Sequence, residues 1–74
     1  MTSSYSSGTR VITCSTLLMN GHTWWAQVVV QTLPTREREE HRFEVPGAED
    51  ALQAEMHAMR WALERYPPQG RGSY

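Results

Sequence analysis

The chain has 74 residues, with seven Arg and no Lys against eight acidic residues, and a formal net charge of −1 at pH 7. A chain of this length forms one domain at most, and its near-neutral balance supplies no large positive field for binding phosphates. A single cysteine, Cys14, excludes an internal disulfide and predicts a small buried residue in a reducing compartment or, more rarely, a free thiol.

Two sequence features bear on localisation and assembly. No basic segment followed by an apolar run marks a signal peptide, and no apolar run approaches the roughly 18 residues that a membrane span needs. We therefore expect a cytoplasmic protein without membrane contact. A domain this small buries only about 60% of the surface that its unfolded chain exposes, so self-association is an expected source of extra stability.

The N-terminal third predicts a leader followed by a strand. Residues 1–9 are rich in Ser and predict a disordered leader. Residues 10–19 are rich in β-branched side chains and predict the first strand.

The stretch from Asn20 to Val30 predicts a tight turn that leads into a long central strand. Asn-Gly between two β-prone runs is the strongest short-range hairpin signal, because a type I′ turn needs positive φ at both central residues. Alternation along the strand separates two faces. The wholly apolar face, which we assign to the core, holds Trp24, Ala26, Val28 and Val30. The other face is half amide and holds Trp25, Gln27, Val29 and Gln31.

The length of the turn decides which side of the first strand faces the core. A two-residue loop places Leu17 opposite Trp24 and brings Val11 and Leu17 to the core face. The opposite face, beside Trp25 and Val29, then holds Ile12, Cys14, Thr16 and Leu18. A longer loop with a different register is the main alternative.

The second half predicts a third strand and a helix. Pro34 stops the second strand, and residues 39–45 predict the third, with His41, Phe43 and Val45 inward and Glu40, Arg42 and Glu44 outward. Residues 48–66 predict a helix that has Gly47 as its N-cap and ends before Pro67. Its core-facing stripe at three-four spacing is predicted to be Ala48, Leu52, Met56, Met59, Leu63 and Tyr66. Residues 67–74 predict a flexible tail.

These elements predict an α+β fold: a three-stranded antiparallel sheet in the order β-β-β-α, with one C-terminal helix packed on one face. The single domain is predicted to span residues 10–66. No predicted element covers the second face of the sheet, which we call the open face. It is a candidate binding surface, and its named residues are Trp25, Gln27, Val29, Gln31 and Arg42. The alternative is a solvated face on which Arg42 covers a scattered Trp25.

A second candidate patch is formed by Trp61 and Arg65. At about 100° per residue Trp61 points roughly opposite Leu52, away from the predicted stripe. It is expected either to pack under the leader or the Pro67-Pro68 segment, or to contact a partner chain, because Trp is enriched at the centres of interfaces.

The sequence contains no arrangement of reactive residues that indicates a particular reaction. The soft metal-ligand candidates are His22, His41, His57 and Cys14, and none of them stand at metal-site spacings. Cys14 lacks a nearby base in sequence, and the cluster of Glu37, Glu39 and Glu40 is typical of a solvated loop. No glycine-rich phosphate loop is present. The sequence therefore predicts no enzyme, no metal and no cofactor.

The run Gly21-x-x-Trp24-x-Ala26-x-Val28-x-Val30 is followed by Phe43 and by a helix from Glu49-Asp50-Ala51 to Arg60-Trp61-Ala62-Leu63. This pattern, over about residues 10–66, resembles a group of small uncharacterised bacterial proteins that form a domain of unknown function. The resemblance implies a β-β-β-α fold and no known activity.

The predicted fold also resembles the sheet-plus-helix DNA-binding domains of the plant AP2 and integrase arm types. That resemblance implies contacts from Trp25, Gln27, Gln31 and Arg42, with Arg10, Arg36 and Arg38 near the ends of the face. Glu37, Glu39, Glu40 and Glu44 lie among them and oppose phosphate binding. We therefore predict a non-enzymatic module that self-associates or binds a protein through the open face, and keep DNA or RNA binding as the alternative.

Overall fold

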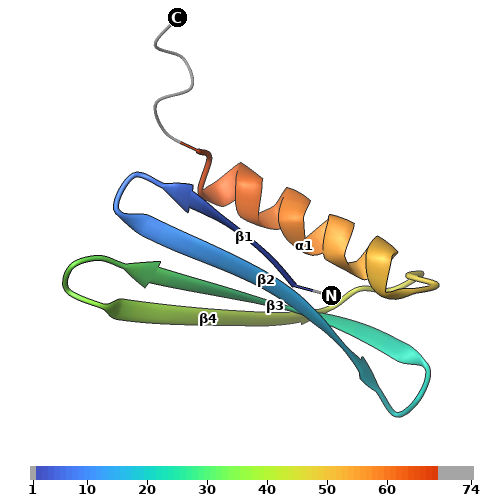
Figure 1. The fold of residues 1–74 in the computed structure, drawn as a ribbon. Helices are drawn as coiled ribbons and strands as arrows, with labels where there is room; N and C mark the ends of the chain where they lie inside the picture. Colours follow the sequence, from blue (N-terminus) through green and yellow to red (C-terminus); the bar gives the residue numbers. More distant parts are fainter. Residues whose placement is uncertain (1, 69–74) are drawn as a thin grey trace, which may run out of the picture.

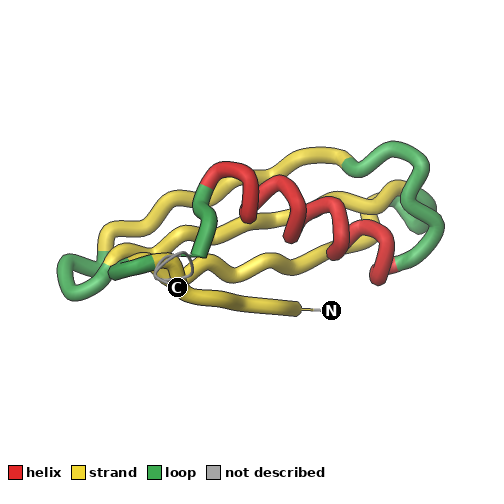
Figure 2. Tube along the Cα trace, turned by 90° about the horizontal axis from the view of Figure 1, so that it is seen from above, coloured by secondary structure: helices red, strands yellow, loops and turns green. Residues whose placement is uncertain are grey.

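The computed structural model describes residues 2–68 and has an α+β fold (Figures 1 and 2). Four antiparallel strands form one meandering sheet in the order β1-β2-β3-β4, and one C-terminal helix lies across one face. The elements are β1 (Thr2–Ser7), β2 (Arg10–Met19), β3 (Thr23–Thr32), β4 (Glu37–Glu44) and α1 (Ala51–Arg65). The prediction of an antiparallel sheet with a C-terminal helix is confirmed, but the sheet has four strands where three were predicted.

The additional strand is β1, which occupies most of the segment that the sequence assigned to a disordered leader. It pairs along its whole length with β2, with Tyr5 opposite Ile12. Polar contacts to the helix end hold it in place: the Tyr5 hydroxyl donates to the Tyr66 carbonyl at 2.8 Å, and the Ser7 hydroxyl donates to the Pro67 carbonyl at 2.6 Å. The leader prediction was wrong because β1 has one large apolar side chain, Tyr5, and otherwise carries Ser and Thr, whose side-chain hydrogen bonds to the helix and its C-terminal end the sequence does not indicate.

The β2–β3 hairpin has a three-residue loop, so the two-residue register was wrong and the longer-loop alternative is confirmed. Asn20 and Gly21 both have positive φ, at 57° and 76°, and the His22 amide donates to the Met19 carbonyl at 3.2 Å. Met19 therefore pairs with Thr23 and Leu18 with Trp24. This one-residue shift exchanges the faces of β2 and brings Ile12 and Cys14 to the helix side.

The helix starts three residues later than predicted and has a different cap. The Asp50 side chain, rather than Gly47, caps it by accepting from the Gln53 amide at 2.9 Å. The Gln53 side chain accepts from the Glu49 amide at 2.9 Å, which ties the preceding loop to the first turn. At the C-terminus the Tyr66 amide donates to the Ala62 carbonyl at 2.7 Å, and Pro67 follows.

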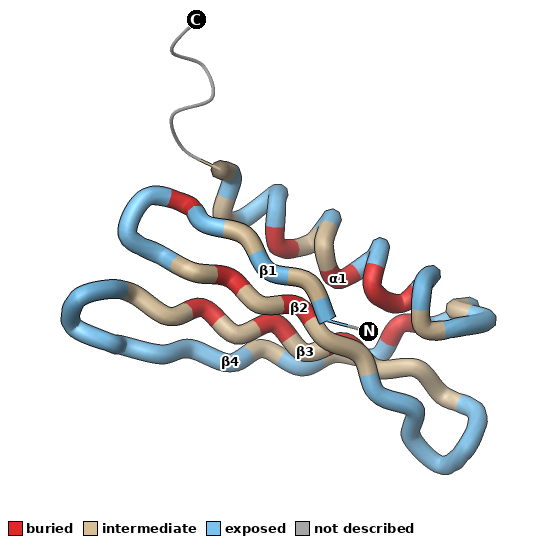
Figure 3. Tube along the Cα trace, viewed as in Figure 1, coloured by how far each residue is buried: buried red, intermediate tan, exposed pale blue. Residues whose placement is uncertain are grey.

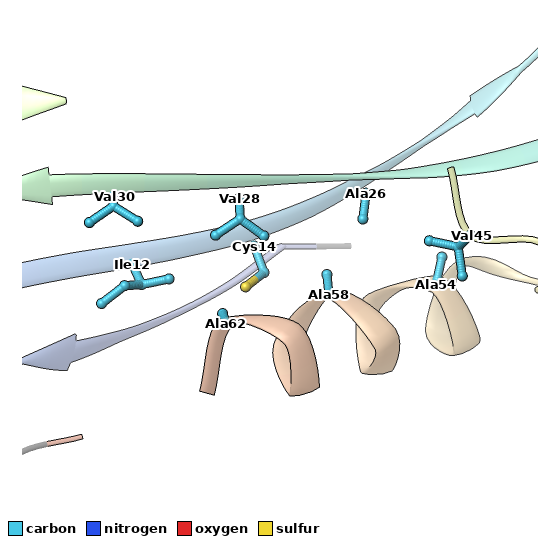
Figure 4. Packing of buried hydrophobic residues seen from close by; sticks show 9 residues of the cluster. All are labelled: Ile12, Cys14, Ala26, Val28, Val30, Val45, Ala54, Ala58 and Ala62. Carbon is cyan, nitrogen blue, oxygen red and sulfur yellow. The ribbon is translucent and has the colours of Figure 1, made fainter. Parts of the chain in front are cut away.

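The core lies between α1 and the helix-facing side of the sheet, and its helical members are small (Figures 3 and 4). Ala54, Ala58 and Ala62 are fully buried and face the sheet. The strands and the segment after β4 contribute Ile12, Cys14, Ala26, Val28, Val30 and Val45. The prediction for β3 is confirmed, since its even-numbered residues face the core.

The predicted core stripe of the helix was wrong in part. Ala48, Met59 and Tyr66 pack at the margin of the core, but the side of the helix that faces the sheet is formed by Ala54, Ala58 and Ala62. Leu52 and Met56 are 52% and 62% exposed, and Leu63 is 38% exposed. A side chain as short as alanine lets the helix backbone lie close to the sheet, which explains why the alanine side is the buried one.

Candidate functional site

The open face exists, and the structure brings its predicted residues together. Trp25, Gln27, Val29 and Gln31 point to the side of β3 away from the helix, and Arg42 on β4 pairs directly with Gln27. The four β3 residues are half-buried and Arg42 is exposed. Trp25 is therefore partly covered by its neighbours on the sheet rather than free in solvent.

The neighbours of Trp25 differ from those predicted. Ile12, Cys14 and Leu18 were expected beside it but lie on the helix side, because β2 is shifted by one residue. The β2 residues that share the open face are Val11, Thr13, Ser15, Leu17 and Met19. Thr13 and Ser15 thus stand at the centre of the open face, where Ile12 and Cys14 were predicted. The open face is therefore less apolar than the sequence suggested.

Charges of both signs alternate along the outer part of the open face. Arg38 forms an ion pair with Glu40 at 3.0 Å, and the Gln27 side-chain amide donates to the same carboxylate group at 3.4 Å. Arg42 is followed on this face by Glu44. The two guanidinium groups are thus matched by two carboxylates, which disfavours phosphate binding on this surface.

The second predicted patch proves to be an aromatic cluster at the margin of the core. The Trp61 ring lies 5.0 Å from the His41 ring and 5.2 Å from the Phe43 ring, centroid to centroid. The guanidinium of Arg65 stacks over the Trp61 ring at 4.2 Å. Trp61 therefore packs on β4, neither under the N-terminal segment nor away from the core, and Arg65 covers it.

The surface that sequence reasoning missed is one flank of α1, between its buried alanine side and its polar solvent side. Leu52, Met56, Met59 and Leu63 form a stripe there, which we call the outer stripe; Met59 is half-buried and the other three are exposed. A shallow hollow along it is lined by Met56, Met59, Leu63, Arg60 and Glu64. Its signal was visible in the sequence as a three-four pattern, but the pattern was assigned to the core.

One buried polar cluster lies under the helix. Glu55 of α1 is buried, and its carboxylate accepts a hydrogen bond from the Ser3 hydroxyl of β1. Its Oε1 atom has no hydrogen-bond partner among the described residues. Cys14 is fully buried. The pKa of its thiol is raised, mainly by burial and to a smaller extent by the nearby Glu55 charge. A buried neutral thiol is a poor nucleophile.

The candidate metal ligands are not gathered into one site. His22 lies in the β2–β3 loop against the Thr23 hydroxyl at 3.0 Å, His41 stacks on Trp61, and His57 is exposed on α1. Within residues 2–68, no group of three or more His, Cys, Asp or Glu residues is arranged to hold a metal ion. The described helix is also too short and too polar to cross a membrane.

Comparison with known proteins does not assign the chain to a family. No family model, no curated protein and no solved structure matches the chain.

Proposed function

We propose that this chain is a non-enzymatic self-association module that binds a second copy of itself through the outer stripe of α1. The observation that supports this most strongly is the exposure of Leu52, Met56 and Leu63 on one side of a single helix. Exposed apolar side chains that form a contiguous patch are typical of interaction surfaces, whereas single scattered ones are not.

The outer stripe is a better contact surface than the open face. Its side chains are long and apolar, and three of the four are exposed. On the open face the exposed apolar side chains are Leu17 and Met19 at one end of β2, and the β3 and β4 part of that face is half-buried or mixed with charges and amides. The contact surface that we propose therefore differs from the one that the sequence suggested, although the predicted class of function is unchanged.

The spacing of the stripe suits a second helix. Its members follow one another at intervals of four, three and four residues, which is the alternation of the seam in a coiled coil. A helix that presents the same alternation can lay its side chains between these four.

Two features favour a second copy as the occupant. The order Leu-Met-Met-Leu reads the same in both directions, so a reversed second copy sets Leu52 against Leu63 and Met56 against Met59. The core is also small, since the largest fully buried side chains are Ile12, Val28, Val30 and Cys14. Burial of four more large side chains per copy would add apolar contacts that this core lacks.

Sedimentation equilibrium over a concentration series tests this proposal. Contacts of one helix with another are small, so we expect a reversible dimer with a Kd on the order of 10–100 µM. Met56→Glu places a charge in the centre of the seam and should leave only monomer. Gln31→Glu adds the same charge to the open face and should leave the Kd unchanged.

Two results would overturn the proposal. One is a wild-type chain that stays monomeric at millimolar concentration. The other is a dimer that Gln31→Glu dissociates and Met56→Glu does not, because that outcome would place the contact on the open face. Far-UV circular dichroism of each variant establishes that the comparison is made between folded chains.

A further inference from the structure

Both central members of the outer stripe are methionines. Met56 and Met59 are neighbours on α1, one helical turn apart, and Leu52 and Leu63 stand at the two ends of the stripe. The reversed pairing proposed above sets Met56 of each copy against Met59 of the other. The centre of the seam therefore consists of four thioether groups, and its ends consist of leucines.

The sulfur atoms of the described residues differ in their access to water. Met56 has the largest exposed fraction among the exposed large hydrophobic side chains, 62%. Met59 is half-buried and lines the same shallow hollow as Met56. Met19 is 40% exposed outside the stripe, and Cys14 is fully buried. An oxidant in solution therefore reaches the methionines of the folded chain, and Met56 before the others.

We propose that Met56 and Met59 are oxidation sites and that their conversion to sulfoxides prevents the self-association of the chain. This inference rests on the proposed contact through α1 and names the regulation of that contact. The oxidant is a hydroperoxide. With hydrogen peroxide, one oxygen is transferred to the thioether sulfur, so that the O–O bond breaks and an S–O bond forms. The sulfur loses two electrons, and the second oxygen of the peroxide takes up the remaining proton and leaves as water.

A sulfoxide is incompatible with the seam for a physical reason. Its oxygen is a hydrogen-bond acceptor, and it is satisfied by water while Met56 stays exposed in the monomer. The four side chains of the stripe contain no hydrogen-bond donor, so a second copy would bury this oxygen without a partner. Burial of an unpaired polar group costs free energy, and two-fold symmetry applies that cost twice in each dimer.

The same coupling predicts that association protects the methionines. Mass action leaves about a fifth of the copies as monomer at about ten times the Kd, and about 85% at about one tenth of the Kd. In excess peroxide, Met56 should therefore be oxidised about fourfold more slowly at the higher protein concentration. Met19 lies outside the stripe and should be oxidised at the same rate at both concentrations.

The decisive experiment measures the dimer dissociation constant before and after treatment with hydrogen peroxide, by sedimentation equilibrium of the untagged chain. Peptide mass spectrometry locates each added oxygen atom. We expect the Kd to rise at least about tenfold once Met56 and Met59 carry sulfoxides. Treatment with the two methionine sulfoxide reductases should return the Kd to its starting value, because these enzymes reduce methionine sulfoxide back to the thioether.

Matched variants locate the effect. The double variant Met56→Leu/Met59→Leu removes both sulfur atoms but keeps apolar side chains of similar volume, so it should still dimerise and its Kd should not respond to peroxide. Met19→Leu removes a methionine outside the stripe and should remain sensitive. Met59 also packs at the margin of the core. The single variant Met59→Leu leaves Met56 oxidisable, so its Kd should still rise while far-UV circular dichroism shows a folded chain.

The outcomes separate this inference from the proposed function. A wild-type chain that does not dimerise overturns both. A dimer that Met56→Glu dissociates, but whose Kd is unchanged when Met56 and Met59 are oxidised, overturns the regulation and leaves association through α1 standing. A peroxide effect that persists in Met56→Leu/Met59→Leu also overturns the regulation. A rise in Kd that the reductases reverse and the double variant lacks supports both.

Discussion

The orientation of α1 makes a strong prediction for a pair of substitutions two residues apart, Ala58→Leu and Met56→Ala. Ala58 is fully buried and faces the sheet (Figure 4), whereas Met56 is 62% exposed. Alanine, leucine and methionine have similar helix propensities, so a large difference between the two variants must come from packing.

The magnitudes follow from the burial of each side chain. Leucine at position 58 inserts three carbons between two close-packed layers, and such overpacking typically lowers the free energy of unfolding by about 1–3 kcal/mol. Full burial of a methionine side chain contributes about 1.5–3 kcal/mol, so truncation of the mostly exposed Met56 should cost under about 1 kcal/mol. We therefore expect Ala58→Leu to be the more destabilising change.

Urea unfolding followed by tryptophan fluorescence measures both values. The experiment is carried out at low micromolar concentration, so that the monomer is compared, and an unchanged m-value shows that both variants unfold by the same transition. If Met56→Ala costs more than Ala58→Leu, the helix presents its methionine side to the sheet and our account of both the core and the outer stripe fails.

Three further predictions test other parts of the fold. Trp61→Ala should lower the free energy of unfolding by about 2–3 kcal/mol in the same assay, because Trp61 packs on His41 and Phe43. The loss should be larger than for Trp25→Ala, and equal losses of stability in the two variants would contradict the packing described for Trp61. Ser3→Ala should cost about 1–3 kcal/mol because Glu55 loses its partner, while Ser4→Ala stays within about 0.5 kcal/mol; equal values would argue against β1. Because the pKa of the Cys14 thiol is raised in the folded state, the unfolded chain loses the thiol proton at lower pH than the folded chain does. The free energy of unfolding should therefore fall as pH rises above about 8.5, by up to about 1.4 kcal/mol per pH unit. Urea unfolding of Cys14→Ala over the same pH range should lack this part of the pH dependence.

The sheet shows how far local sequence signals reach. Alternation in β3 and the inward-facing residues of β4 were predicted correctly, because each strand carries its own apolar period. The register of β2 was not, because Asn20-Gly21 is equally compatible with loops of two and three residues. A single residue in the loop then moved Cys14 from the open face to the core.

The helix and β1 show where local signals fail. Two stripes with the same spacing run along α1, and hydropathy favoured the stripe of Leu52 and Met56 over that of Ala54 and Ala58. The close packing of helix and sheet favours small side chains at the contact. It depends on tertiary structure, so local sequence patterns do not predict it. Strand β1 carries a single aromatic residue, Tyr5, and is held by hydrogen bonds to partners more than fifty residues away.

The central claim is that Leu52, Met56 and Leu63 of the outer stripe face solvent in the monomer and that a second copy covers the stripe on association. The most direct measurement follows the methyl resonances of ¹³C-labelled methionine through a dilution series. The methyl groups of Met56 and Met59 should shift together with concentration, with the midpoint given by sedimentation, while that of Met19 on the open-face side of β2 stays fixed. A shift confined to Met19, or no shift of any of the three up to millimolar concentration, would contradict the claim.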